Sequence, residues 1–178
     1  MKQLLNRFCI YIHNLFTVNP LAFIIEFKLQ FKIMIFIHQI EAEETFSVRQ
    51  PVLRPGKPIE SCHFEGDNLG TTAHFGLYKN DKIIGVVSVF KVQNPNFIRK
   101  EQYQIRGMAV LEKYQRKGLG VQLVKKAEHY VKEKKGELIW FNARESAVPF
   151  YEKLNYKTKG SPFEISEIGT HFVMLKCI

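Results

Sequence analysis

One stretch in the middle of the chain joins a basic loop, two glycines and a helix. Residues 115–120 read Gln-Arg-Lys-Gly-Leu-Gly and follow an apolar run that ends at Val110. After Gly120, apolar side chains recur at helical spacing, namely Leu123, Val124, Ala127, Tyr130 and Val131. This spacing predicts a helix that begins at or near Gly118.

A helix start of this composition suits an anionic ligand. The first four N–H groups of a helix have no partner within it, and the helix dipole adds partial positive charge there. Glycine at positions 118 and 120 leaves these amides open, and Gln115, Arg116 and Lys117 add donors and two positive charges. The pattern indicates a phosphate-binding helix N-terminus. The alternative is an ordinary helix entry that happens to be rich in glycine.

Two common phosphate loops do not fit this stretch. A Walker A loop requires Gly-Lys-Ser/Thr, whereas Gly120 is followed by Val121 and Gln122. A dinucleotide fingerprint requires a third glycine where this chain has Leu123.

The stretch does resemble the Gln/Arg-x-x-Gly-x-Gly/Ala signature of the GNAT superfamily, the acyl-CoA N-acyltransferases. A strand-like segment, 107–110, precedes it and a long amphipathic helix follows. A second block similar to the family comes next, in segments 138–144 and 147–156. The resemblance extends from about Met34 to Ile178, and its most specific part is 103–156.

The resemblance implies an α+β (mixed α/β) fold with one GNAT-like domain. Its central sheet would be mostly antiparallel, with a parallel strand–helix–strand unit whose strands splay to admit the cofactor. The residue pattern agrees, because a strand predicted at Tyr103–Val110 and an apolar run at Leu138–Asn142 flank the helix. A right-handed crossover would place the helix start at the carboxyl ends of the two strands, where open α/β sheets bind ligands.

Shorter patterns predict the remaining elements. They are a strand at Met34–Ile40, a partly helical segment at Glu41–Leu53, a hairpin of strands Ala73–Tyr78 and Ile83–Val92, a short helix capped by Ser146 that runs through Leu154, and a last hairpin at about Phe163–Ser166 and Phe172–Cys177.

The resemblance also implies acetyl-CoA as the acyl donor, held mainly by backbone groups. The backbone of Met108, Ala109 and Val110 would pair with the pantetheine arm, and an amide near Ala109–Val110 would hold the oxyanion. Asn142 would form a hydrogen bond with the arm. The pyrophosphate would be held by the amides of Gly118, Leu119, Gly120 and Val121, helped by Gln115, Arg116 and Lys117.

The implied reaction is direct attack of a primary amine on the thioester. Tyr151 matches the tyrosine that commonly protonates the departing sulfur, although it also falls on an apolar helical stripe and could simply be a core residue. The base that takes the proton of the amine is less defined. Glu101, Glu164 and His171 flank the strands on the acceptor side, and each is also explained as an ordinary surface or structural residue.

The net charge of +9 favours anionic ligands and concentrates around the helix start. Such a field steers a polyanion such as coenzyme A. Nucleic acid would respond to the same field, but the sequence lacks a recognition helix, a zinc finger and an RNA-binding aromatic signature. We therefore expect no nucleic-acid partner.

The three cysteines, Cys9, Cys62 and Cys177, are odd in number and far apart. This spacing favours neither a disulfide framework nor a zinc site, so we expect no metal and a reducing, cytoplasmic location.

Residues 1–33 differ in composition from the rest, with four basic residues against Glu26 alone. The uncharged run Phe8–Ile25 is at the lower length limit of a membrane span, but it contains Asn14, Asn19 and Pro20. We expect no membrane partner, and an N-terminal extension (1–33) upstream of the acetyltransferase domain (34–178).

The residue pattern does not define the acceptor beyond a small-molecule or peptide amine. Segments Val52–Gly70 and Gly160–His171 are expected to select it. Two alternatives to the enzyme stay open, namely a domain that binds acyl-CoA as a sensor without turnover and a basic nucleic-acid-binding module. The oligomeric state is open as well, a homodimer included.

Overall fold

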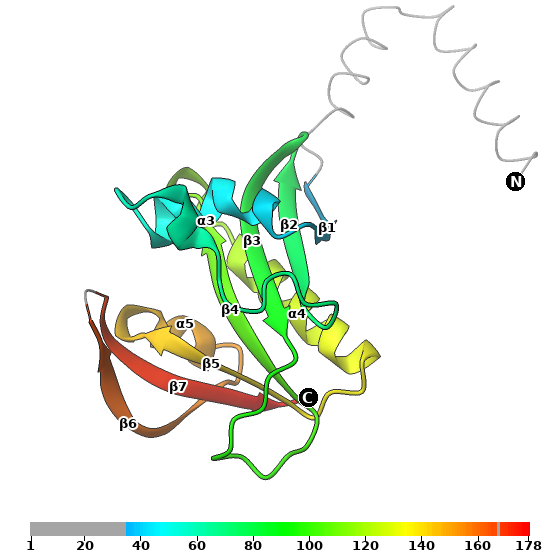
Figure 1. The fold of residues 1–178 in the computed structure, drawn as a ribbon, viewed down its shortest axis with the longest axis vertical. Coiled ribbons are helices and arrows are strands. Elements are labelled where there is room, and N and C mark those ends of the chain that lie inside the picture. Colours follow the sequence, from blue (N-terminus) through cyan, green and yellow to red (C-terminus); the bar gives the residue numbers. More distant parts are fainter. Residues whose placement is uncertain (1–34, 167) are drawn as a thin grey trace, which may run out of the picture. The chain divides into compact units, whose positions relative to one another are not determined.

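The computed structural model describes residues 35–166 and 168–178. They form a seven-stranded sheet in the order β1-β2-β3-β4-β5-β7-β6 (Figure 1). All neighbouring strands are antiparallel except β4 and β5, which are parallel. The predicted mixed α+β fold is confirmed. The strands are β1 (Ile35–Ile40), β2 (Ala73–Lys79), β3 (Lys82–Phe90), β4 (Gln102–Val110), β5 (Leu138–Arg144), β6 (Lys157–Ile165) and β7 (Gly169–Cys177).

The predictions for residues 1–33, including the apolar run Phe8–Ile25 and the N-terminal extension, lie outside the described residues. Within the described part, no helix is long and apolar enough to cross a membrane.

Within residues 35–178, as far as they are described, three α-helices accompany the sheet, each close to short 3-10 turns. The α-helices are α3 (Phe46–Leu53), α4 (Leu119–Glu133) and α5 (Val148–Glu152). The 3-10 turns are Glu43–Thr45, Ile59–Cys62, Glu112–Tyr114 and Glu145–Ala147. The long helix α4 begins where the sequence predicted, because Gly118 is its N-cap residue at φ 75°.

The two longer helices cover opposite faces of the sheet. Leu123 of α4 belongs to the same buried cluster as Val87 of β3, whereas Val48 of α3 packs in a second cluster with Val86. Successive side chains of a strand point to opposite faces, so α4 and α3 lie on different sides. The apolar stripe of α4 is buried as predicted, apart from the half-buried Tyr130.

The parallel strands β4 and β5 separate after a short contact. They pair only at residues 102–104 of β4 and 138–140 of β5. Beyond that point β4 pairs with β3 alone, and β5 pairs with β7 as far as Arg144. The predicted splay is confirmed, and it leaves two strand edges without a neighbour.

A β-bulge bends β4 beside this opening. Three steps along β4, from Arg106 to Ala109, oppose two steps along β3, and Gly107 has φ 60°. A Cβ atom on Gly107 would lie 2.8 Å from the Phe64 ring and 2.9 Å from Arg49 Nε. Glycine is therefore required by both its backbone angle and the lack of space. The extra residue turns Arg106 and Ala109 toward the α3 face.

Two predictions near the C-terminus need correction. Ser146 does not cap α5, since the 3-10 turn that contains it runs directly into the helix and Ala147 is the N-cap residue. A capping side chain needs a non-helical backbone position, which this continuous turn does not give Ser146. The helix also ends at Glu152, before Leu154.

The last hairpin is longer than predicted, because β6 begins at Lys157. Its first residues are polar and exposed, so pairing with β7 rather than apolar alternation makes them a strand.

A buried ion pair connects α3 to the sheet. Arg49 and Asp67 have fully buried side chains, and Arg49 Nη1 lies 2.7 Å from Asp67 Oδ2. Arg49 also donates to Ser88 Oγ at 2.8 Å and to the Cys62 carbonyl at 2.9 Å. Burial alone would raise the pKa of Asp67, but the hydrogen bond and charge of Arg49 hold this pKa below its usual value.

Replacing Asp67 by asparagine should lower the free energy of unfolding by about 3–5 kcal/mol, because it leaves the Arg49 charge buried without a partner. Urea denaturation at neutral pH measures this change. Asp81→Asn, in the exposed hairpin turn, is the matched control and should cost less than about 0.5 kcal/mol.

Acid should weaken the wild-type protein through the same carboxylate. The folded-state pKa of Asp67 is depressed, so its contribution is complete above its unfolded pKa and is lost as the pH falls through the folded value. The stability difference between wild type and Asp67→Asn should therefore shrink on acidification below about pH 4. An unchanged difference would contradict this assignment.

Candidate active site

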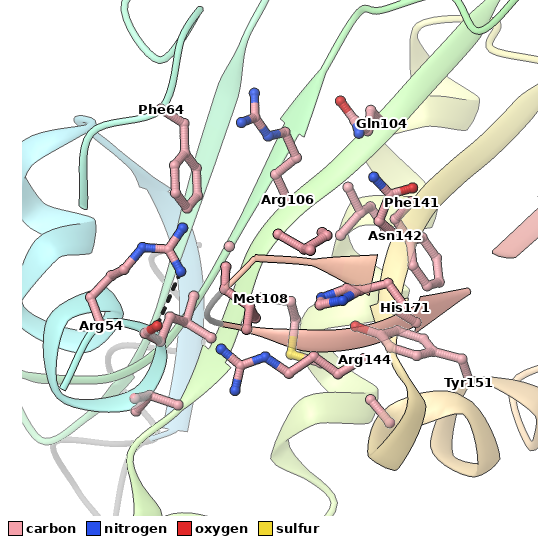
Figure 2. A pocket seen from close by; sticks show the side chains of 18 residues that line it. Arg54, Phe64, Gln104, Arg106, Met108, Phe141, Asn142, Arg144, Tyr151 and His171 are labelled. Carbon is pink, nitrogen blue, oxygen red and sulfur yellow. Dashed lines mark hydrogen bonds between the residues drawn. The ribbon is translucent and has the colours of Figure 1, made fainter. Parts of the chain in front are cut away.

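A cavity of about 370 Å³ opens where β4 and β5 separate (Figure 2). It is lined by the end of α3, Phe64, the middle of β4, the end of β5, Tyr151 and the β6–β7 turn. Among the residues predicted for the site, it brings together Met108, Asn142, Tyr151 and His171. Both segments expected to select the acceptor reach this cavity.

Two of the three candidate bases lie elsewhere. Glu101 is bonded to Lys91 Nζ at 2.8 Å, and its carbonyl accepts the N–H of Leu138 at the paired end of β4 and β5. Glu164 is exposed and accepts the Thr170 hydroxyl at 2.6 Å. Neither glutamate lines the cavity. Glu101 precedes β4, at the end where β4 and β5 are still paired.

His171 is the candidate base that the fold brings to the cavity. It is 5% exposed, and its Nδ1 lies 2.7 Å from the Gly169 carbonyl oxygen. A carbonyl only accepts, so Nδ1 carries the hydrogen and Nε2 of the neutral ring keeps its lone pair. The ring is thus held in the tautomer that can accept a proton at Nε2.

Tyr151 belongs to the core and to the cavity wall at once. It is 6% exposed, and its ring lies 4.3 Å from the Phe141 ring and 4.9 Å from the Phe150 ring, centroid to centroid. Burial raises the pKa of its phenol. The hydroxyl therefore stays protonated at neutral pH and can donate a hydrogen bond, but it is a weaker acid than free tyrosine.

The start of α4 presents free amides. No side chain caps the helix and no acidic residue occupies its first turn. A Cβ atom on Gly118 would meet nothing within 4 Å, so the space beside this first residue is open. Arg116, at φ 57°, and Lys117 are exposed beside it. Such a helix start fits a diphosphate.

The structure also defines what Gln115, Leu119 and Gly120 contact at this helix start. Gln115 Nε2 donates to the Val110 carbonyl at 2.8 Å, which holds the loop against the end of β4. The Leu119 side chain is buried, so this residue offers only its amide. A Cβ atom on Gly120 would lie 3.3 Å from the Phe150 ring and 4.0 Å from Met108 Cε, so the helix start is close to the cavity wall.

At the opening, the β4 backbone has no neighbouring strand on the side of β5. Met108, Ala109 and Val110 all follow the last residue of β4 that pairs with β5, Gln104. Met108 also lacks a register partner in β3, because the bulge falls there. An extended ligand can therefore form backbone hydrogen bonds along this edge, as a further strand would.

The cavity also contains side chains that the sequence did not identify as site residues. Three are arginines, Arg54, Arg106 and Arg144, and two others are Phe64 and Gln104. They come from a turn, a loop and two strands without any shared motif, so only their proximity in the fold shows that they belong together. Among the described residues, no group of three or more His, Cys, Asp or Glu could hold a metal ion.

A mixed sheet that opens between two parallel strands, next to an uncapped glycine-rich helix start, forms a cleft suited to an acyl-CoA thioester. Comparisons with known proteins agree with this class. Residues 35–156 match the Acetyltransferase (GNAT) family, and the chain belongs to this family of N-acetyltransferases.

The chain is 34% identical over 145 residues to an uncharacterized N-acetyltransferase of Bacillus subtilis, YitI, covering 82% of this chain and 97% of that protein. Among solved structures, the Escherichia coli ribosomal-protein-S18-alanine N-acetyltransferase is similar with a TM-score of 0.66 and 17% identity, over 82% of this chain and 94% of the other. A Bacillus subtilis acetyltransferase in complex with CoA gives a TM-score of 0.58 and 19% identity, over 83% and 99%. At identities of 17% and 19%, these two solved structures support the fold alone.

Replacing Gly120 by aspartate should raise the dissociation constant for CoA by roughly tenfold or more, because a carboxylate would then lie close to the amides that we expect to hold the diphosphate. Isothermal titration calorimetry at fixed ionic strength measures this change. His129→Asp adds the same charge on an exposed later turn of α4 and should have little effect. Wild-type affinity in a folded Gly120→Asp protein would mean that the phosphates bind elsewhere.

Proposed function

We propose that the protein is an acetyl-CoA-dependent N-acetyltransferase that acetylates a primary amine by direct attack on the thioester. The observation that carries this proposal is the cavity at the β4–β5 opening, where an amine site with His171 meets Tyr151 and the free edge of β4. Acetyl-CoA supplies an activated acyl group whose leaving group is a thiolate.

The chain would orient the donor with backbone groups at two places. The open amides of Gly118–Val121 fit the diphosphate, and the unpaired edge of β4 fits the pantetheine arm. Asn142 is exposed on the facing edge of β5, where its amide can bond the arm. An amide at Ala109 or Val110 would stabilise the negative charge that develops on the carbonyl oxygen, an effect typically of about 3 kcal/mol.

His171 would act as the general base. An alkylamine is charged at neutral pH, so it must lose a proton before its nitrogen can attack. Nε2 of the neutral imidazole can take this proton, while the hydrogen bond from Nδ1 to Gly169 fixes the ring. The nitrogen–carbon bond then forms as the carbon–sulfur bond breaks.

Tyr151 would stabilise the departing sulfur. Because burial raises the pKa of the phenol, complete proton transfer to a thiolate is unfavourable, since a thiol titrates near ~8.5. The contribution that the geometry supports is a hydrogen bond from the hydroxyl to the sulfur as charge develops. The alkylammonium ion loses two protons in all, one to His171 before attack and one from its nitrogen as the amide forms. One of them ends on the thiol of CoA and the other passes to solvent.

Tyr151→Phe should lower kcat by about 10²-fold with little change in the affinity for CoA, because it removes one donor and keeps the packed ring. Steady-state release of free thiol measures kcat, and calorimetry measures CoA binding. Phe97→Leu, which removes a ring outside the cavity, is a control for altered aromatic packing. An unchanged kcat would assign Tyr151 to the core alone.

His171→Gln should reduce kcat/KM by about 10²-fold at neutral pH, because the base is then absent. Steady-state kinetics with acetyl-CoA saturating, together with CoA affinity by calorimetry, tests this role. His129→Gln, on the exposed face of α4, should keep the wild-type kcat/KM. If His171→Gln keeps the wild-type kcat/KM, another group is the base.

The enzyme and the sensor predict different results in one assay. Acetyl-CoA is mixed with a broad panel of primary amines, and thiol release and acetylated product are measured together. Turnover of any amine supports the enzyme. Absence of turnover across the panel, with CoA binding intact by calorimetry, would favour a sensor.

A further inference from the structure

The cavity holds more positive charge than acetyl transfer requires. Arg54, Arg106 and Arg144 line it, and none of its eighteen lining residues is Asp or Glu. Among the residues that the structure describes, none of the three arginines forms an ion pair with a carboxylate. We propose that these arginines bind an oxyanion of the acceptor, which is then a small amine that also carries a carboxylate, phosphate or phosphonate group. This inference rests on the proposed function.

Two of the arginines are arranged around one aromatic ring. The guanidinium carbons of Arg54 and Arg106 lie 5.9 Å and 4.9 Å from the centre of the Phe64 ring (Figure 2). The Phe64 N–H donates to Asp67 Oδ2 at 2.8 Å, so the buried ion pair fixes the loop that carries this ring. A guanidinium held over a ring keeps its N–H edge available for an oxyanion.

The charge of these arginines is not needed to balance the fold. Asp67 already neutralises the nearby buried Arg49. Among the described residues, the side-chain hydrogen bonds of Arg54 and Arg106 go to the carbonyls of Leu53 and Glu65, at 3.2 Å each. Arg106 is half-buried, and burial lowers the pKa of its guanidinium.

The third arginine lies beside the candidate base. Arg144 of β5 and His171 of β7 are register partners, and side chains directly opposite in an antiparallel pair share one face with Cβ atoms about 5 Å apart. An amine whose nitrogen approaches Nε2 of His171 would thus have the Arg144 side chain nearby. An oxyanion only a few bonds from that nitrogen could reach it. The oxyanion should be close to the amino group, as it is in an amino acid or a short aminoalkylphosphonate.

The same charge disfavours acceptors without an anion. An alkylammonium ion that enters a site with three arginines is repelled, whereas a zwitterion offsets the repulsion with its own negative group. Nearby cations also lower the pKa of a bound amine, which favours the neutral nucleophile.

The arginines are poorly placed for the phosphates of the donor. Arg54 follows α3, and the bulge turns Arg106 toward the same face of the sheet, where Phe64 and Arg49 lie. The helix start that fits the diphosphate belongs to α4, which covers the opposite face. Its residues do not line this cavity.

The size of the cavity limits the acceptor further. About 370 Å³ is near the lower end of the range for ligand sites, and the acetyl end of the donor would occupy part of it. A free small molecule fits this space better than a folded chain segment.

The first experiment compares acceptors that differ only in the anion. Each of the common amino acids is assayed against its own C-terminal amide, with aminomethylphosphonate and phosphoethanolamine as phosphorus analogues. We expect kcat/KM for the best acid to exceed that of its amide by about tenfold or more. The phosphorus compounds then show which oxyanion is preferred.

The second experiment removes the cation. Arg144 is exposed, so Arg144→Met should fold, and it should reduce the preference for acid over amide to near unity while CoA affinity stays the same. A merely structural role would not change this ratio selectively. Arg99→Met removes an equally exposed arginine outside the cavity and should keep the wild-type preference.

The outcomes separate this inference from the function on which it rests. Equal use of acids and amides would overturn the inference and leave the acetyltransferase intact. The same conclusion would follow if the protein bound CoA but neither bound nor acetylated any amine that carries an oxyanion. Failure of the protein to bind CoA would instead overturn the proposed function, and the inference with it.

Discussion

The separation of β4 and β5 after three paired residues is the feature on which the rest of the site depends. Backbone N–H and C=O groups need partners, and a sheet that opens in its interior leaves two edges of unpaired groups facing each other. Such a gap persists because each strand stays paired on its outer side, β4 with β3 and β5 with β7. The rigid outer sheet therefore preserves an opening that a ligand can complete as an extra strand would.

The buried Arg49–Asp67 pair connects this opening to the acceptor side. A buried ion pair is weak evidence for added stability, because desolvation offsets much of the attraction. Its effect here is positional: Asp67 binds both Arg49 and the N–H of Phe64, and the Phe64 ring packs against Gly107 at the β4 bulge. One carboxylate thus fixes the helix end, the aromatic ring and the bulged strand relative to one another. Arg54 and Arg106, which line the cavity, lie over the same ring.

The role proposed for Tyr151 would use for chemistry a side chain that also packs the core. Its ring completes an aromatic cluster in the core, and that burial is the cause of the raised pKa of its phenol. A group in this environment stays protonated and is held in one orientation. It is better suited to donate a hydrogen bond to a developing thiolate than to give up its proton completely. His171 is likewise held in one orientation, because its Nδ1 bonds the Gly169 carbonyl.

The sequence by itself determined the parts of this protein that depend on local pattern. The glycines at 118 and 120, the apolar stripe of α4 and the buried run of β5 predicted the helix start, the crossover and the mixed fold, because periodicity and glycine placement act over a few residues. It failed at Ser146 and at the start of β6, where a continuous turn and cross-strand pairing decide the backbone. Only the tertiary structure distinguished His171 from Glu101 and Glu164, and only it gathered Arg54, Arg106 and Arg144. Those residues are far apart in the chain, and the bulge at Gly107, which turns Arg106 toward the others, is decided by how β4 packs on its neighbours.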